Sequence, residues 1–221
     1  MKLYSGPLSM FGAKAEIAAR EKGVAFALEM VAFSQAAGYA PKHPEVLRIN
    51  PKRQVPVLVD GALEIFDSTQ IFEYFESLKP TPALWPAEPK ARARARLFEH
   101  KSDEIYFPPV IRLMGLQATP DDPAAVEARA VALAFYDDME KDIGAKEWLA
   151  GSYSYADIAF YMAQIFGDRM GAPMTDAHPR LQQWRDRMSA RPPVREVAGA
   201  MGRYLLSQGR KIPAFLEKLA A

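Results

Sequence analysis

The chain has 221 residues, of which 49% are hydrophobic, and its 28 basic and 27 acidic side chains leave a formal net charge of +1. This length supports one large domain or two modest ones, and the balanced charge argues against a nucleic-acid partner held by phosphate contacts. No apolar run approaches the roughly 18 residues that span a bilayer, and the absence of cysteine excludes disulfides, thiolate metal sites and enzyme-borne thiol chemistry, so we expect a cytoplasmic protein without a membrane partner.

Strand and helix patterns alternate through the N-terminal part of the chain. In chain order we predict a strand at 2–5, a helix at 10–22, a strand at 27–32, a short segment at 45–49, a β-hairpin at 57–66 and a helix at 68–77. In the last of these Ile71, Phe75 and Leu78 recur at i, i+4 and i+7, which predicts one stripe packed on a sheet. The order β-α-β-α-β-β-α predicts a small mixed sheet covered by helices.

A proline-rich stretch then interrupts every periodicity. Residues 80–86 contain three prolines, which is typical of a linker between domains. Beyond the linker the pattern is helical to the end, with helices predicted at 89–116, 123–142, 155–167, 179–190, 193–206 and 213–219. We therefore predict a first domain at 1–78, a linker at 79–88 and an all-helical second domain at 89–221.

One helix start in the second domain carries a capping signature. Ser154 supplies a hydroxyl at the N-cap and Asp157 a carboxylate three residues later, which is the reciprocal arrangement of a capping box. We interpret both as structural residues rather than as a catalytic pair. The histidines at 43, 100 and 178 lie far apart and lack the spacing of metal ligands, so no metal site is expected.

The turn Gln54-Val55-Pro56 stands directly before the first strand of the predicted hairpin, where proline removes a backbone N–H. If the Val55-Pro56 bond is cis, the chain turns sharply into the strand. We expect such a turn to leave the N–H and C=O of Val55 at a sheet edge, where an extended peptide can pair with them. The alternative is a trans proline that opens an ordinary edge strand.

Two further positions lie at predicted helix starts. Asp67 and Ser68 combine an ammonium acceptor with a hydroxyl and free N–H groups that suit a carboxylate, so they fit a ligand with α-amino and α-carboxyl groups. Ser9 stands between the first strand and the first helix, where a hydroxyl and the helix dipole favour a bound thiolate. Plain N-capping is the alternative role for each of these residues.

In their order and spacing, four signals together resemble the glutathione transferase family: the Gln54-Val55-Pro56 turn, the Asp67-Ser68 pair, the position of Ser9, and the box from Ser154 to Asp157. The resemblance extends from Lys2 to about Glu196. It implies an α/β thioredoxin-like N-terminal domain that binds glutathione. It also implies an all-α C-terminal domain that supplies the pocket for an electrophile.

The resemblance assigns roles to individual residues. Val55 is implied to pair with the cysteinyl backbone of glutathione, and Asp67 and Ser68 are implied to hold its γ-glutamyl end. Ser9 matches the activating serine of the theta, tau and zeta-like classes, including bacterial members. The implied glutathione site also includes Phe11, Lys42, Gln54 and Pro56, and either Lys42 or His43 is implied to reach the glycyl carboxylate.

The implied mechanism uses the thiol of the substrate. Ser9 donates a hydrogen bond to the glutathione sulfur, lowers its pKa and leaves a thiolate that attacks a small electrophile. The chain departs from the family pattern at Asp67, which replaces the more usual glutamate and shortens the reach by one methylene. The lack of cysteine removes the omega-type and glutaredoxin-like reactions, which leaves thiolate addition, substitution, isomerisation or reductive cleavage.

The electrophile pocket is predicted around a pair of prolines. Pro108 and Pro109 fall inside the predicted helix 89–116 and should kink it near the implied cleft between the domains. We expect an apolar or aromatic electrophile there, against a wall formed by Phe11, Phe107, Ile111, Met114 and Phe166.

Two functions stay open at this point. The first is a glutathione transferase that the resemblance implies to be a homodimer. The second is a non-catalytic member of the same fold that binds glutathione or another protein, because fold alone does not define function. The combination of Ser9, Val55-Pro56 and Asp67-Ser68 favours the enzyme, since a pure scaffold has no need of all three.

Overall fold

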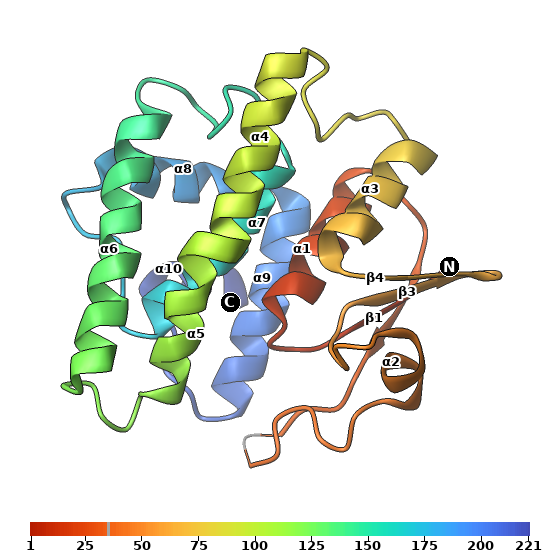
Figure 1. The fold of residues 1–221 in the computed structure, drawn as a ribbon, viewed down its shortest axis with the longest axis horizontal. Coiled ribbons are helices and arrows are strands. Elements are labelled where there is room, and N and C mark those ends of the chain that lie inside the picture. Colours follow the sequence, from red (N-terminus) through yellow and green to blue (C-terminus); the bar gives the residue numbers. More distant parts are fainter. Residues whose placement is uncertain (35) are drawn as a thin grey trace. The chain divides into compact units, whose positions relative to one another are not determined.

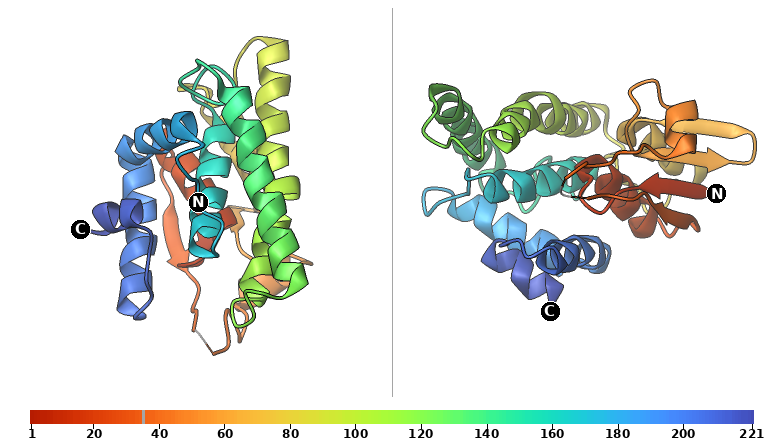
Figure 2. Two further views of the ribbon diagram at one scale, coloured as in Figure 1. Left: turned by 90° about the vertical axis from the view of Figure 1, so that its left-hand side faces the viewer. Right: turned by 90° about the horizontal axis from the view of Figure 1, so that it is seen from below.

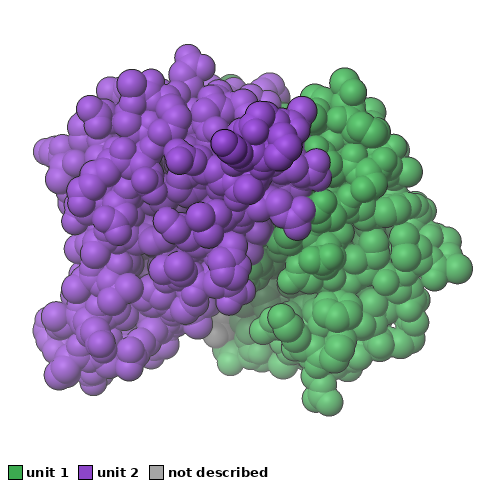
Figure 3. Space-filling view, turned by 45° about the horizontal axis from the view of Figure 1, so that its top comes forward, with its two compact units in different colours: residues 1–83, 193–211, 215–221 green, residues 84–192, 212–214 purple. Residues whose placement is uncertain are grey.

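The computed structural model describes residues 1–34 and 36–221, which form two compact units (Figures 1 and 3). Unit 1 contains residues 1–83, 193–211 and 215–221, and unit 2 contains residues 84–192 and 212–214. The C-terminal segment 193–211 therefore groups with the N-terminal residues rather than with the other helices. The domain boundaries predicted at 78 and 89 stay a prediction.

Unit 1 is built on a four-stranded mixed sheet with the order β2-β1-β3-β4. Strands β1 and β2 are parallel, whereas β1–β3 and β3–β4 are antiparallel. Its elements are β1 (Lys2–Ser5), α1 (Met10–Glu21), β2 (Ala27–Met30), α2 (Pro44–Ile49), β3 (Val57–Asp60), β4 (Leu63–Phe66), α3 (Ser68–Leu78), most of α9 (Pro192–Ser207) and most of α10 (Ala214–Ala220).

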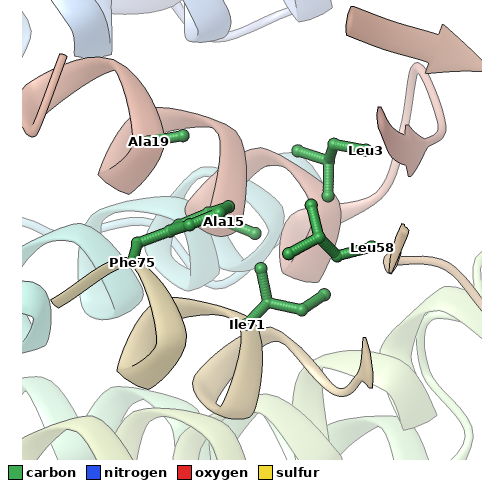
Figure 4. Close-up of a cluster of buried hydrophobic side chains, with 6 residues drawn as sticks. All are labelled: Leu3, Ala15, Ala19, Leu58, Ile71 and Phe75. Atoms are coloured by element: carbon green, nitrogen blue, oxygen red, sulfur yellow. The ribbon is translucent and has the colours of Figure 1, made fainter. Parts of the chain in front are cut away.

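The two faces of the sheet carry separate cores because side chains alternate along each strand. Leu3 and Leu58 are fully buried on the face covered by α1 and α3, where they meet Ala15, Ile71 and Phe75 (Figure 4). The opposite face packs on α2 through Tyr4, Val57 and Val46, with Val31 in the same cluster. Ile71 and Phe75 of the predicted stripe are buried, but Leu78 is 51% exposed, so the prediction is wrong at the last position of the stripe. The predicted element order is confirmed.

Unit 2 is helical, as predicted, and residues 84–192, all of which the structure describes, contain no strand. Figure 2 gives two further views in which the long α6 can be followed in green; α6 packs against α5. The elements are α4 (Pro89–Lys101), a π-helical segment η1 (Ser102–Tyr106), α5 (Phe107–Gly115), α6 (Pro123–Ile143), α7 (Tyr155–Arg169) and α8 (Pro179–Ala190).

The predicted single helix at 89–116 is divided by the π-helical segment η1. A proline at position i removes the hydrogen bond to the carbonyl of residue i−4 and its ring clashes with that carbonyl. For Pro108 and Pro109 these carbonyls belong to Glu104 and Ile105, which both lie in η1. The irregularity therefore precedes the prolines instead of coinciding with them.

Helix α7 lies at the centre of unit 2, with every residue from Tyr155 to Gly167 buried. The predicted capping box at its start is present, and Asp157 is fully buried. Its Oδ2 accepts hydrogen bonds from the N–H of Ser154 at 2.9 Å and from the Ser154 hydroxyl at 3.1 Å. Its Oδ1 accepts from the N–H of Leu149 and the indole N–H of Trp184, both at 3.0 Å. Burial raises the pKa of Asp157 to about 6, against these hydrogen bonds.

Among the helices of residues 1–34 and 36–221, none combines the length and the apolar character that crossing a bilayer requires.

Candidate functional site

The sheet register of unit 1 brings three of the predicted site segments to one end of the sheet. Tyr4 pairs with Val57, and Val57 pairs with Phe66, so the end of β1, the start of β3 and the end of β4 lie in one row. Neighbouring strands are about 4.8 Å apart. The loop that leads to Ser9, the turn at Val55 and the start of α3 therefore follow adjacent strand ends.

Ser9 occupies the N-cap of α1, with an extended backbone. Its side chain is buried, and its Oγ accepts a hydrogen bond from the N–H of Gly12 at 2.9 Å. This contact uses the oxygen as an acceptor and leaves the hydroxyl hydrogen available, because no acceptor for it occurs among the described residues. A hydrogen-bond donor at the positive end of a helix dipole is suited to stabilising an anion.

The sequence interpretation missed two residues that position Ser9. A Cβ atom at Gly12 would lie 2.1 Å from the Oγ of Ser5, so the helix approaches the strand this closely only because glycine stands there. The hydroxyl of Tyr39 accepts a hydrogen bond from the N–H of Leu8 at 3.0 Å and ties down the loop before Ser9. A glycine three residues after the N-cap was the only sequence signal; nothing in the sequence pointed to Tyr39.

The Val55-Pro56 peptide bond is cis, as predicted. The expectation that Val55 lies at a sheet edge is wrong, because β3 is an internal strand between β1 and β4. Val55 instead lies two residues before the start of that internal strand and is half-buried. Its N–H and C=O have no hydrogen-bond partner within residues 1–34 and 36–221, whereas the carbonyl of exposed Gln54 accepts from the Asn50 side chain at 2.6 Å.

Asp67 is the N-cap of α3 and has a positive φ of 75°, an uncommon conformation for a residue other than glycine. Its Oδ1 accepts from the N–H of Thr69 at 3.0 Å and from that of Gln70 at 3.3 Å. Its Oδ2 has no partner in the part of the chain that the structure describes. Ser68 is buried beside it. Asp67 thus caps the helix with one oxygen, and its second oxygen takes no part in the cap.

Lys42 and His43, the two candidates for contact with the glycyl carboxylate, differ in the contacts that they make within the protein. His43 is the N-cap of α2, where its Nδ1 accepts from the N–H of Glu45 at 3.2 Å, and its ring packs on Tyr4. His43 is therefore engaged in the fold. Lys42 is exposed, and of the two it is the side chain whose charge faces solvent.

Four of the residues predicted to line the electrophile pocket belong to unit 2, and Phe11 belongs to unit 1. Phe107 and Phe166 are buried and form an edge-to-face pair with ring centroids 5.9 Å apart. Ile111 and Met114 are 49% and 42% exposed on α5. The aromatic pair is thus part of the packed interior, while Ile111 and Met114 present apolar surface. Their role in a pocket stays a prediction.

No group of three or more histidine, aspartate and glutamate side chains within residues 1–34 and 36–221 is arranged to hold a metal ion. The groups that the candidate site offers to a ligand are the Ser9 hydroxyl at a helix N-terminus, the backbone N–H and C=O of Val55, and one carboxylate oxygen of Asp67.

Comparison with known proteins agrees with this arrangement. Residues 3–83 match the glutathione S-transferase N-terminal domain, and residues 104–192 match the glutathione S-transferase C-terminal domain. The probable glutathione S-transferase GSTF2 of Oryza sativa subsp. japonica is 28% identical over 211 residues, which cover 91% of this chain and 97% of the rice protein.

A second relative matches only about half of this chain. The stringent starvation protein A homolog of Coxiella burnetii is 34% identical over 109 residues, and the match spans 48% of each chain, or about half the length of that relative. The crystal structure of a glutathione S-transferase from Rhodospirillum rubrum F11 has the same fold, with a TM-score of 0.79, 24% identity and coverage of 100% of this chain and 99% of that one.

A thioredoxin-like sheet with a helical partner unit defines the class, and the two domain matches identify the family. The chain belongs to the glutathione S-transferase family.

Proposed function

We propose that this protein binds glutathione in unit 1, activates its thiol with Ser9 and transfers the thiolate to a small, apolar or aromatic electrophile. The observation that carries the proposal is the sheet register, which collects Ser9, Val55 and Asp67 at one end of the sheet. Each of the three offers an unused group of the right kind for one part of the tripeptide.

In this proposal Ser9 donates its hydroxyl hydrogen to the glutathione sulfur while the N–H of Gly12 holds the oxygen in place. An unperturbed thiol has a pKa near about 8.5, and each unit by which the site lowers the pKa corresponds to about 1.4 kcal/mol. One well-placed donor at a helix N-terminus supplies an effect of this size. Ser9 forms no covalent bond and acts only by stabilising the negative charge on sulfur.

The remaining contacts orient the tripeptide. The N–H and C=O of Val55 pair with the cysteinyl backbone, the free Oδ2 of Asp67 accepts from the γ-glutamyl ammonium group, and the Ser68 end of α3 receives the γ-glutamyl carboxylate. Lys42, rather than His43, is the candidate for the glycyl carboxylate. The electrophile and a homodimer are proposed from the family resemblance alone.

Retention of the purified chain on immobilised glutathione, followed by a conjugation assay with 1-chloro-2,4-dinitrobenzene, tests the proposal. We expect specific elution by free glutathione and turnover above the rate without enzyme. Binding without turnover against a panel of chlorinated, epoxide and unsaturated carbonyl electrophiles would favour a non-catalytic glutathione-binding protein. Neither binding nor turnover would leave the alternative of a non-catalytic protein-interaction module.

Replacing Asp67 with asparagine should weaken glutathione binding about tenfold without unfolding α3. Asparagine keeps the capping oxygen and tolerates positive φ, but it removes the charge that attracts the ammonium group. Isothermal titration with glutathione gives the change in affinity, and thermal unfolding checks the fold. Glutaryl-cysteinylglycine, which lacks the α-amine, is the matched ligand and should bind the two proteins equally well. Equal glutathione affinity would mean that the carboxylate serves the fold alone.

A further inference from the structure

The loop that leads to Ser9 is held in place by the side chain of Tyr39. The hydroxyl of Tyr39 accepts a hydrogen bond from the N–H of Leu8 at 3.0 Å, and no other acceptor for that N–H occurs in the described part of the chain. A Cβ atom at Gly6 would lie 2.4 Å from Cε1 of Tyr39, so the ring lies directly on the backbone of the loop. The N–H of Ser9 donates to the carbonyl of Gly6 at 3.0 Å. The position of Ser9 therefore depends on the position of Tyr39.

Tyr39 is in turn held by Phe33. Ser34 and Gly38 exchange two backbone hydrogen bonds of 2.8 Å, which bring the flanking residues Phe33 and Tyr39 together. The two rings pack edge to face with centroids 4.8 Å apart, which is within the roughly 4.5–7 Å range of favourable aromatic pairs. Because a turn and a ring contact both join the two residues, a displacement of Phe33 moves Tyr39 as well.

Helix α9 holds Phe33 from the C-terminal part of unit 1. The hydroxyl of Tyr204 donates to the carbonyl of Phe33 at 3.2 Å, and the two rings pack edge to face with centroids 6.3 Å apart. Both residues line a cavity together with β2, α1 and other residues of α9. The hydrogen bond joins residues that are 171 positions apart in the chain. Through it the segment 193–211 reaches the turn that carries Tyr39.

Helix α9 is itself fixed at two further points, so it gives Tyr204 a stable support. Arg20 of α1 forms an ion pair with Glu196 of α9 at 2.8 Å, and Figure 1 shows the two helices next to each other. A Cβ atom at Gly199 would lie 2.4 Å from the carbonyl oxygen of Leu219, so α9 and α10 are in direct backbone contact. The position of Tyr204 is thus set by the packing of α9 and not by the turn that it contacts.

We propose that Tyr204 is a positioning residue for Ser9 and that it acts through Phe33 and Tyr39. Tyr204 holds the carbonyl and ring of Phe33, Phe33 holds the ring of Tyr39, and Tyr39 holds the loop that aligns the Ser9 hydroxyl with the substrate sulfur. The inference rests on the proposed function, in which Ser9 activates the glutathione thiol. Misplacing a catalytic group by about 1 Å lowers a rate by up to about 100-fold, so support of this loop bears directly on turnover.

Tyr204→Phe removes only the hydroxyl that donates to the carbonyl of Phe33. We expect kcat for conjugation of glutathione to 1-chloro-2,4-dinitrobenzene at pH 6.5 to fall about threefold. The dissociation constant of glutathione should change less than about twofold, since Val55 and Asp67 are untouched. The difference in kcat from the wild type should become smaller above about pH 8.5, where an unactivated thiol ionises. A loss of kcat that is equally large at high pH would contradict a role in thiol activation.

Tyr39→Phe acts one step closer to Ser9 and should have the larger effect. It takes away the acceptor of the Leu8 N–H, so we expect kcat at pH 6.5 to fall about tenfold. Tyr74→Phe is the matched control, because it removes a tyrosine hydroxyl that donates to Asp60 at 2.7 Å, at the other end of strand β3. The control should keep the kcat and the pH dependence of the wild type. An equal loss of kcat in Tyr74→Phe would show a general effect on unit 1 and would refute the specific role of Tyr204.

Combining Tyr204→Phe with Ser9→Ala separates positioning of Ser9 from a general loss of structure. If Tyr204 acts only through Ser9, its hydroxyl has no further effect on turnover once the Ser9 hydroxyl is gone. The double variant should therefore have the same kcat as Ser9→Ala alone. A loss of about threefold that persists in the Ser9→Ala background would overturn the inference.

Amide hydrogen exchange of the wild type and the variants tests the support of the loop without relying on turnover. The peptide that covers residues 5–12 should exchange at least about threefold faster in Tyr204→Phe and in Phe33→Leu, which loses both ring contacts, and at the wild-type rate in Tyr74→Phe. Unchanged exchange in both Tyr204→Phe and Phe33→Leu would overturn the inference. If the wild type formed no conjugate, the proposed function would fail, and the exchange rates would still show whether α9 holds the loop of Ser9.

Discussion

Replacing Ser9 with alanine is expected to lower kcat for glutathione conjugation by roughly 100-fold at neutral pH, which is the effect of removing one donor to a developing or resident anion. The dissociation constant of glutathione should change less than about threefold, because Val55 and Asp67 hold the tripeptide in the proposed complex. Steady-state kinetics with 1-chloro-2,4-dinitrobenzene and calorimetric titration with glutathione measure the two quantities separately.

The pH dependence distinguishes thiol activation from a loss of structure. Without the hydroxyl, the pKa of the glutathione thiol should return toward about 8.5. The difference in kcat between the wild type and Ser9→Ala should therefore become smaller as the pH rises past that value. Ser9→Thr keeps a hydroxyl and a capping oxygen and should retain most of the activity. The alanine variant also loses a helix cap, at about 1 kcal/mol, so it is assayed well below its unfolding temperature. Wild-type turnover in Ser9→Ala would remove Ser9 from the mechanism.

The largest expected effect on stability is that of Asp157→Ala. This change leaves the N–H groups of Leu149 and Ser154 and the indole N–H of Trp184 buried without their acceptor. Each unpaired buried donor costs about 1–3 kcal/mol, so we expect the free energy of unfolding to fall by at least about 3 kcal/mol. Urea denaturation at pH 7.5 measures the change. Ser154→Ala, which keeps the carboxylate, should cost only about 1 kcal/mol, and equal losses in the two variants would refute the central role of Asp157.

The stability that Asp157 contributes should also depend on pH. Its folded pKa of about 6 lies above the ordinary aspartate value of 3.8, so the native state binds the proton more tightly than the unfolded state does. The stabilisation from protonation is complete below about pH 4 and is lost as the pH rises through about 6. Relative to Asp157→Asn, the wild type should therefore lose roughly 2.5 kcal/mol between pH 4 and pH 7.5. If the free energy of unfolding of the wild type, relative to that of Asp157→Asn, stayed constant or increased with pH, the raised pKa of Asp157 would be contradicted.

Local signals predicted the elements of this chain well, because periodicity and caps act over a few residues. The positions of proline and glycine predicted most helix and strand ends close to where they are observed. The capping box at Ser154 and Asp157 could be recognised in the sequence directly. The predicted helix 89–116 was wrong at its centre. The clash of Pro108 and Pro109 with carbonyls four residues earlier moves the irregularity upstream, and only the observed hydrogen-bond register reveals it.

The candidate site was only partly visible in the sequence. Ser9, Val55 and Asp67 were found because each carries its own local signature, but Gly12 and Tyr39 were missed. Tyr39 reaches the loop before Ser9 from 31 positions further along the chain, so no local pattern links the two. The competing candidates Lys42 and His43 were equivalent in sequence, and they became distinct only when the ring of His43 was seen to cap α2.

By itself, the amino-acid sequence determined the order of strands and helices, the absence of cysteine chemistry and the candidate residues proposed to hold a thiolate, a carboxylate and an ammonium group. The tertiary structure decided which of them meet, because the strand register sets which loops share one end of the sheet. It also decided that the segment 193–211 joins unit 1 and closes a cavity over β2. Such contacts join residues far apart in the chain, and their free energy comes from burial that no local pattern encodes.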